Sequence, residues 1–249
     1  DGVPQNGRDN YRYRRILLKL SGEALAGGGA APLDAAVLRL VAHEVKDVTA
    51  EGVQAAIVVG GGNFVRGDDL SRRIGIHEVT GHNMGMLATV INALALQDVM
   101  EAEGLTTRVL TAVEMRQVAE PFIRRRAIRH LEKGRVVILA AGTGSPYFTT
   151  DTAAALRAIE VEADALLMAK RGVSGVYDKD PHRHPDAVMF HHLDYMDLLN
   201  RDLKVMDATA VALCKDNKLD IVVFDITQPG NLKRAVLGEQ IGTLVGGRQ

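Results

Sequence analysis

A run of glycine and hydroxyl side chains with the chemistry of a phosphate site lies near the middle of the chain, at residues 142–152. Residues 135–141 form an apolar, β-branched run of strand length, and residues 153–163 have the composition of a helix. This order places backbone N–H groups, threonine hydroxyls and a helix N-terminus beside the carboxyl end of a buried strand, where anions bind. A β-to-α loop with an ordinary threonine N-cap explains the same residues equally well.

A lysine lies inside another apolar run of strand length, residues 16–20. Lys19 is unusual there, because buried strands rarely contain lysine. Its side chain either extends out at the strand end or reaches toward a phosphate. Ser21 and Gly22 follow at the predicted strand end, and the glycine permits close approach of the backbone.

Three consecutive glycines, residues 60–62, directly follow the apolar run 55–59. Without Cβ atoms, their N–H groups can approach a ligand closely, and Arg66 can add charge-assisted hydrogen bonds to phosphate. We interpret this loop as functional. It is neither the G-x-G-x-x-G dinucleotide fingerprint nor a P-loop, because the chain has neither spacing.

The loop after the predicted strand 165–170 combines glycines, cations and Tyr177 within residues 171–181. At the end of a parallel strand, such a loop could hold an adenine and a polyphosphate. Histidines at 182, 184, 191 and 192 lack a recognisable zinc spacing, so we predict no metal site. Asp207 precedes a helical segment and is interpreted as its N-cap.

Composition limits the class of protein. The chain has 249 residues, 47% apolar and 24% charged, with a net charge of −1, which gives no overall field for nucleic acid or an acidic membrane. The single cysteine, Cys214, excludes an intrachain disulfide, favours a reduced cytosolic setting and is interpreted as a core residue. Residues 1–10 are polar and expected to be disordered, and no apolar run is long enough to span a bilayer.

Strand-like and helical segments alternate along the chain, which predicts an α/β fold: a mostly parallel central sheet with helices on both faces. One long helix is expected to begin near residue 84 and to end at Gly104. Its apolar spacing predicts a buried face, formed by Met84, Leu87, Ile91, Leu94 and Ala95.

Six motifs, in order, resemble those of the bacterial UMP (uridylate) kinases, which belong to the amino-acid-kinase family. They are KLSGEAL at 19–25, GGGN at 60–63 with RG at 66–67, MGMLAT at 84–89, GTGSPYFTTD at 142–151, GVY at 175–177 with DP at 180–181, and KVMD at 204–207. The resemblance covers residues 13–246.

This resemblance implies the amino-acid-kinase fold and transfer of the ATP γ-phosphoryl group to UMP, giving UDP and ADP with Mg²⁺, in pyrimidine nucleotide biosynthesis. It implies a single domain over residues 11–249, divided roughly into a UMP-binding lobe, 11–163, and an ATP-binding lobe, 164–249. It also implies a cytoplasmic homo-oligomer, a hexamer in the family, with GTP as activator and UTP as inhibitor.

The resemblance also assigns roles to individual residues. The catalytic candidates are Lys19, Arg66, Asp151 and Asp207, the two aspartates orienting lysines around the transferred group. The predicted ATP-binding residues are Lys19, Leu20, Ser21, Gly22, Gly62, Arg66, Lys170, Arg171, Tyr177 and Asp180. The predicted UMP-binding residues are Gly61, His82, Thr143, Gly144, Ser145, Pro146, Tyr147, Phe148, Thr149 and Thr150.

Three positions depart from the family's pattern. His82 stands where the family has an aspartate that binds the UMP ribose; neutral imidazole offers one donor and one acceptor, whereas carboxylate only accepts. Ser174 replaces the aspartate of Val-Asp-Gly-Val, and Arg171 stands where asparagine is frequent. Residues 29–32 lack the glycine-aromatic-glycine pattern common in that loop.

Two other functions are considered beside UMP kinase. One is a kinase of the same fold that phosphorylates a carboxylate or carbamate, which the UMP-like motif at 142–151 disfavours. The other is a nucleotide-binding regulator or storage protein with reduced or lost turnover. His82 favours this last hypothesis, and the full set of charged residues that includes Lys19 and Asp151 disfavours it.

Overall fold

The structure is a computed structural model, and it describes residues 11–28, 31–65, 74–201, 203 and 205–247. The strands are β1 (Arg15–Leu20), β2 (Gln54–Val59), β3 (Thr107–Thr111), β4 (Glu120–Pro121), β5 (Val136–Ala140), β6 (Ala165–Lys170), β7 (Val176–Tyr177), β8 (Met189–Phe190), β9 (His192–Leu193), β10 (Asp220–Asp225) and β11 (Thr243–Val245). The helices are α1 (Gly22–Leu25), α2 (Ala35–Ala50), α4 (Glu78–Ala102), α5 (Arg124–Glu132), α6 (Thr150–Glu160), α7 (Tyr195–Asn200), α8 (Ala208–Asp216) and α9 (Asn231–Leu237).

One sheet of nine strands runs through the molecule in the order β4-β3-β5-β2-β1-β6-β10-β11-β9. From β4 to β10 all neighbouring pairs are parallel, whereas β10 and β11 are antiparallel. Strand β1 lies between β2 and β6, so the chain changes direction across the sheet at β1, the place where open α/β sheets bind ligands. The predicted mostly parallel α/β fold is confirmed.

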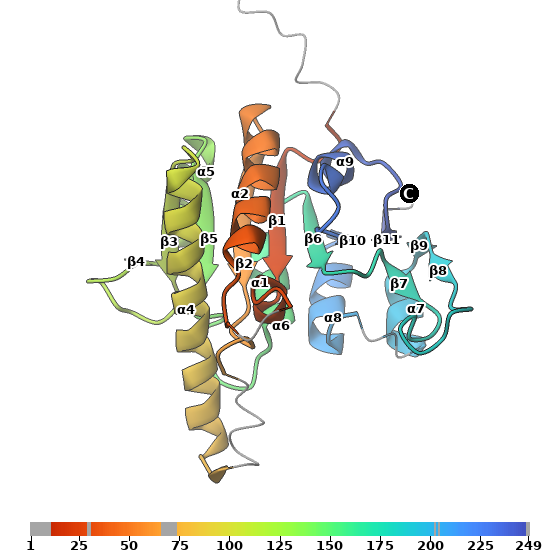
Figure 1. The fold of residues 1–249 in the computed structure, drawn as a ribbon, viewed down its shortest axis with the longest axis horizontal. Helices are drawn as coiled ribbons and strands as arrows, with labels where there is room; N and C mark the ends of the chain where they lie inside the picture. The colour runs from red at the N-terminus through yellow and green to blue at the C-terminus, as the bar shows by residue number, and fades with distance from the viewer. Residues whose placement is uncertain (1–10, 29–30, 66–73, 202, 204, 248–249) are drawn as a thin grey trace, which may run out of the picture.

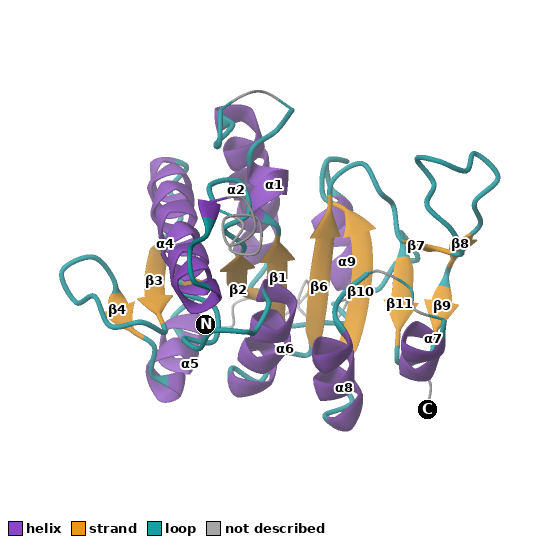
Figure 2. Ribbon diagram, turned by 90° about the horizontal axis from the view of Figure 1, so that it is seen from below, coloured by secondary structure: helices purple, strands orange, loops and turns teal. Residues whose placement is uncertain are grey.

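Helices cover both faces of the sheet (Figure 2). Apolar residues of α2, α4 and α9 form one core, and those of α5, α6, α7 and α8 form the other. Cys214 belongs to the second core, where burial raises the pKa of its thiol to about 12, so it is an inert core residue as predicted. None of the helices in the described ranges has both the length and the apolar composition needed to cross a membrane.

The alternation of side chains along β1 determines where its lysine points. Ile16, Leu18 and Leu20 pack in the core under α2 and α4, whereas Leu17 packs in the core under α6 and α8. Because successive side chains of a strand point to opposite faces, Lys19 lies on the side of α6. Figure 1 shows α1 and α6 near the carboxyl end of β1.

The predicted buried face of the long helix is wrong in part. Leu87 and Ile91 of α4 are each 49% exposed. Beside these two residues α4 buries small or polar side chains, including Ala88, Asn92 and Ala93, and nearer its C-terminus it also buries the larger Leu96 and Met100. In this part of the helix the small residues let its axis approach the sheet closely, so Leu87 and Ile91 on the next face remain in contact with solvent.

Two other elements differ from their predicted bounds. The helix expected from residue 153 begins at Thr150, because Thr149 is its N-cap and accepts a hydrogen bond from Thr152 N–H at 3.1 Å. The break expected at Glu120 and Pro121 is instead the edge strand β4. Proline is tolerated there because an edge strand has ladder positions that need no N–H donor.

The N-terminus of α9 is capped by a carboxylate from another helix. Its own N-cap residue, Gly230, has no side chain to accept a hydrogen bond. Instead Glu44 of α2, only 4% exposed, accepts from Gly230 N–H at 2.6 Å and from Leu232 N–H at 2.9 Å. The buried charge is therefore compensated by two N–H groups and by the positive end of α9.

We predict that Glu44→Gln lowers the free energy of unfolding by about 2 kcal/mol, because one of the two charge-assisted hydrogen bonds loses its acceptor. Equilibrium urea unfolding followed by circular dichroism measures the effect. Glu51→Gln is the matched control, since Glu51 forms only a surface pair with Lys233 at 3.2 Å and its loss should leave stability unchanged. Equal losses in the two variants would contradict the capping role.

Candidate active site

Most of the residues predicted to bind UMP line one cavity of about 690 Å³. It lies among the loop after β2, the N-terminal half of α4 and the loop between β5 and α6. The predicted UMP-binding residues in its lining are Gly61, His82, Thr143, Ser145, Tyr147, Phe148, Thr149 and Thr150, and Gly62, predicted to bind ATP, lines it too. Gly144 and Pro146 belong to the same loop but do not line the cavity. The structure thus brings together three segments that are distant in the sequence.

The turn that begins the loop 141–149 is fixed from two sides. Ala141 and Gly142 both have positive φ, at 61° and 57°, a conformation that costs energy for the alanine. Ala141 N–H donates to Thr89 Oγ1 of α4 at 2.7 Å. Arg157 of α6 donates to the carbonyl of Gly142 at 3.2 Å, and its guanidinium stacks 4.0 Å from the centre of the Phe122 ring.

His82 holds the far part of the same loop. The backbone N–H of Tyr147 donates to His82 Nδ1 at 3.0 Å. The two rings meet edge to face, with centroids 4.9 Å apart and an interplanar angle of 82°. In the neutral imidazole, this hydrogen bond places the ring proton on Nε2.

The glycines after β2 are needed for packing against protein, not only for approach to a ligand. A Cβ on Gly61 would lie 2.6 Å from the carbonyl oxygen of Gly85 and 2.9 Å from the Ala88 side chain. A Cβ on Gly22 would lie 2.7 Å from the backbone nitrogen of Gly62. The sequence interpretation gave only the ligand as the reason for these glycines. The structure adds close contact between the loops after β1 and β2, and between the second loop and α4.

A pair of asparagines supports this glycine loop. Asn92 of α4 is fully buried and donates to the Gly60 carbonyl at 2.6 Å and to Asn63 Oδ1 at 2.7 Å. Asn63 in turn donates to Asn92 Oδ1 at 2.9 Å and to the Pro32 carbonyl at 2.6 Å. Because a buried amide must satisfy its donors and acceptors, the pair fixes the loop relative to α4.

A buried ion pair lies next to this cavity. Lys19 Nζ is 2.8 Å from Asp151 Oδ1, and the lysine is only 8% exposed. Asp151 Oδ1 is buried and has no hydrogen bond of good geometry within the described residues, so its contact with Lys19 is an ion pair defined by distance alone. Asp151 directly follows Thr150, a residue of the cavity lining, in the first turn of α6. The pair is therefore adjacent to the cavity in the chain and in space.

A second lysine shares this environment. Lys170 ends β6 on the same face of the sheet as Lys19, and its Nζ donates to the Val205 carbonyl at 2.9 Å. Burial lowers the pKa of Lys170, and the charge of Lys19 lowers it further, while Asp151 opposes both. Two lysines around one carboxylate leave excess positive charge, which an anion such as phosphate would offset.

Asp207 accepts hydrogen bonds from threonine hydroxyls, whereas the sequence predicts that it orients lysines. It is the N-cap of α8 and accepts from Ala210 N–H at 3.0 Å. It also accepts from Thr149 and from Thr152, the latter at 2.9 Å. Within the described ranges no lysine lies at ion-pairing distance from it, so its observed contacts join α8 to the start of α6.

The other predicted ATP-side residues lie further along the carboxyl edge of the sheet. Leu20 ends β1, and the Ser21 hydroxyl caps α1 by accepting from Ala24 N–H at 3.1 Å. Tyr177 lies in β7, and the Asp180 carboxylate accepts from His182 N–H at 2.9 Å. Arg171 is exposed after β6. No described contact joins Tyr177, Asp180 or Arg171 to Lys19, and Arg66 lies outside the described residues.

Several residues of the cavity lining were not predicted as site residues. They are Glu23, Val65, Glu78, Gly81, Gly85, Met86, Thr89 and Gly142. Helical spacing would have found part of this set, because the positions one and two turns after His82 on the same face of α4 are Gly85, Met86 and Thr89. Glu78 has no such signal, because nothing in the sequence near it indicates that α4 begins there.

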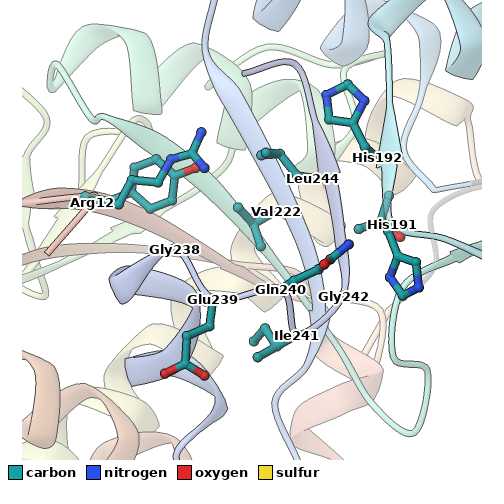
Figure 3. Close-up of a pocket in the computed structure, with 13 residues that line it drawn as sticks. Arg12, His191, His192, Val222, Gly238, Glu239, Gln240, Ile241, Gly242 and Leu244 are labelled. Atoms are coloured by element: carbon teal, nitrogen blue, oxygen red, sulfur yellow. The ribbon is translucent and has the colours of Figure 1, made fainter. Parts of the chain in front are cut away.

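A smaller cavity of about 240 Å³ lies beside β10, β11 and the end of α9 (Figure 3). Arg12, His191, Glu239, Ile241 and Leu244 are among its lining residues. It contains none of the predicted site residues, and the Arg12 guanidinium there already pairs with Asp220 at 3.1 Å. We therefore assign the candidate active site to the larger cavity and the adjacent lysines.

Comparison with known proteins agrees with this geometry. The family model described as the amino acid kinase family matches residues 14–225. A crystal structure of UMP kinase from Bacillus anthracis superposes with a TM-score of 0.91 at 40% identity, covering 94% of this chain and 96% of that one.

Two further crystal structures are similar over almost the whole chain. UMP kinase from Ureaplasma parvum gives a TM-score of 0.88 at 36% identity, covering 95% of this chain and 100% of that one. Uridylate kinase from Archaeoglobus fulgidus gives a TM-score of 0.72 at 28% identity, covering 93% of this chain and 99% of that one. With matches of this extent and with the sheet order and site described above, the chain belongs to the amino acid kinase family.

Proposed function

We propose that this protein is a UMP kinase, which transfers the γ-phosphoryl group of ATP to UMP and gives UDP and ADP. The observation that carries the proposal is the position of the Lys19–Asp151 pair beside the cavity of about 690 Å³. The similarity to UMP kinases at 40% and 36% identity supports the choice of acceptor. A cation beside an acceptor pocket is what phosphoryl transfer needs, since the protein contributes mainly position and charge.

The acceptor is proposed to bind in the larger cavity. Donors for its phosphate are proposed to come from the Thr143 N–H, the Ser145 and Thr150 hydroxyls and the N-terminus of α6. The Thr143 hydroxyl and the Ser145 N–H are already hydrogen-bonded within the loop. Gly61 of the glycine loop and His82 of α4 complete the lining on which the acceptor is proposed to rest. The proposed division is a UMP-binding lobe of roughly residues 11–163 and an ATP-binding lobe of roughly residues 164–249, with ATP phosphates reaching the end of β1 in the first lobe.

ATP is proposed to bind along the carboxyl ends of β1 and β6. The residues proposed to contact its phosphates are Lys19, Leu20, Ser21, Gly22, Gly62 and Arg66. Those proposed to lie beside its adenosine are Lys170, Arg171, Tyr177 and Asp180. Asp151 holds the Lys19 ammonium at 2.8 Å, so that its charge is in place before the transfer begins. Asp207 holds the start of α6 through Thr152, and thereby the position of Asp151.

Magnesium is proposed to enter with ATP. Among the residues that the structure describes, no three His, Cys, Asp or Glu side chains are grouped to hold a metal ion. Mg²⁺ needs few protein ligands when phosphate oxygens and water complete its octahedron, so this site fits a nucleotide-bound ion. When bound, the ion neutralises charge on the phosphates that Lys19 also faces.

Homo-oligomer formation is the proposed reason for the exposed apolar face of α4. Leu87 and Ile91 are one helical turn apart and each 49% exposed, a pattern that a second copy could bury. The family pattern supports a hexamer, a cytoplasmic setting in pyrimidine nucleotide biosynthesis, and control by GTP and UTP as further parts of the proposal.

We predict that ADP release with ATP and Mg²⁺ is rapid with UMP and slow with CMP, dUMP or no acceptor, because the solved structures to which the chain is similar are UMP kinases. A coupled ADP-release assay measures this, and chelation of Mg²⁺ with EDTA should abolish it. Turnover with a carboxylate or carbamate in place of UMP would instead favour another kinase activity. ATP and UMP binding without any turnover would favour the regulator hypothesis.

We predict that Lys19→Met lowers kcat roughly 100- to 1000-fold, the loss typical when one preorganised charge is removed from a transition state. The Kd for UMP, measured by calorimetry, should change little, because Lys19 lies on the ATP side. Lys233→Met is the control, since Lys233 only pairs with Glu51 on the surface. Equal losses of turnover and UMP affinity would refute the catalytic role.

We predict that Ile91→Glu lowers the molar mass measured by sedimentation velocity, because a charge on the α4 face would be buried against a second copy. The circular dichroism spectrum should stay unchanged, since Ile91 is half exposed in the single chain. Val188→Glu is the matched control, because Val188 is 63% exposed and lies far from α4 in the sequence. An unchanged mass for Ile91→Glu would place the interface elsewhere.

A further inference from the structure

His82 and Tyr147 join α4 to the loop between β5 and α6 through two contacts. One is the hydrogen bond from Tyr147 N–H to His82 Nδ1 at 3.0 Å. The other is the edge-to-face contact of the two rings, whose centroids are 4.9 Å apart. Both residues line the larger cavity, so the contacts close part of its wall.

Tyr147 needs a contact of this kind to keep its conformation. Its φ is +70°, in the left-handed region that residues with a side chain rarely adopt. Its side chain is 62% exposed, so core packing does not hold it. Strained backbone at a binding site persists only when its surroundings determine it, and the His82 contacts are the ones that the structure shows at this residue.

We propose that His82 is a positioning residue: it holds Tyr147 in its left-handed conformation and thereby keeps the loop 143–149 shaped to receive the acceptor before the acceptor arrives. The proposal rests on the proposed function only in naming UMP as that acceptor. A loop that is already ordered does not pay the entropic cost of ordering when the acceptor binds, so loss of the His82 contacts should lower the affinity for the acceptor.

The hydrogen bond makes the proposal specific to one atom of the imidazole. Asparagine places Oδ1 on Cγ, as histidine places Nδ1, so His82→Asn keeps an acceptor at the same distance from the backbone. Glutamine places its oxygen one bond further out, and leucine has no acceptor. His82→Asn should therefore preserve the contact to Tyr147, whereas His82→Gln and His82→Leu should lose it.

Hydrogen–deuterium exchange of the ligand-free protein tests the contact directly. We expect the Tyr147 amide, followed in peptides that cover 143–149, to exchange faster in His82→Gln and His82→Leu than in the unchanged protein and in His82→Asn. Peptides from β3 should exchange alike in all four proteins, which controls for general destabilisation. Equal exchange of the 143–149 peptides in His82→Leu and the unchanged protein would overturn the proposal, and this readout needs no catalytic activity.

Steady-state kinetics test the consequence for the acceptor. In His82→Gln and His82→Leu, KM for UMP should rise roughly three- to tenfold, the loss of about one hydrogen bond, with kcat and KM for ATP near their original values. His82→Asn should restore KM for UMP. A fall in kcat at unchanged KM, or no rescue by asparagine, would contradict a positioning role; absence of UMP turnover in the unchanged protein would instead refute the proposed function and leave the exchange result standing.

Discussion

The buried contact between Lys19 and Asp151 constrains the rest of this structure, because neither charge is stable there without a partner. Lys19 reaches the partner only because its position in β1 points toward α6, and Asp151 reaches the lysine only because α6 begins at Thr150. A shift of one residue in the register of β1 would turn the lysine into the opposite core, under α2 and α4. The order of β2, β1 and β6 in the sheet then places the glycine loop on one side of the pair and Lys170 on the other.

The loop after β5 depends on its neighbours more than on its own residues. Thr89 of α4 accepts from Ala141, Arg157 of α6 donates to Gly142, and His82 of α4 accepts from Tyr147. Each contact lies at or next to a residue with positive φ, so the strain of the loop is balanced by side chains from two helices. A pocket held in this way needs little reorganisation when a charged substrate enters, which is the condition under which fixed donors contribute most to phosphoryl transfer.

The sequence predicted those parts of the fold and site that depend on local pattern. Apolar runs of strand length located the principal strands, and glycines with hydroxyls at strand ends located the cavity. It failed where the answer depends on a distant partner. The spacing of Leu87 and Ile91 indicates an apolar face, but not that the neighbouring Ala88 and Asn92 would be buried in their place. Likewise, nothing near Glu44 indicates that it caps α9, because Gly230 is 186 positions away.

Asp207 illustrates why a motif can identify a residue without giving its contacts. The pattern KVMD indicated an acidic group near the lysines, whereas the structure shows a carboxylate shared by the N-terminus of α8 and two threonines at the start of α6. The Val205 carbonyl, two residues earlier, accepts from Lys170. One short segment therefore contacts a lysine of the proposed ATP side and hydroxyls beside the proposed acceptor cavity. Because both contacts depend on the same few residues of backbone, displacement of this segment would disturb both sides of the site together.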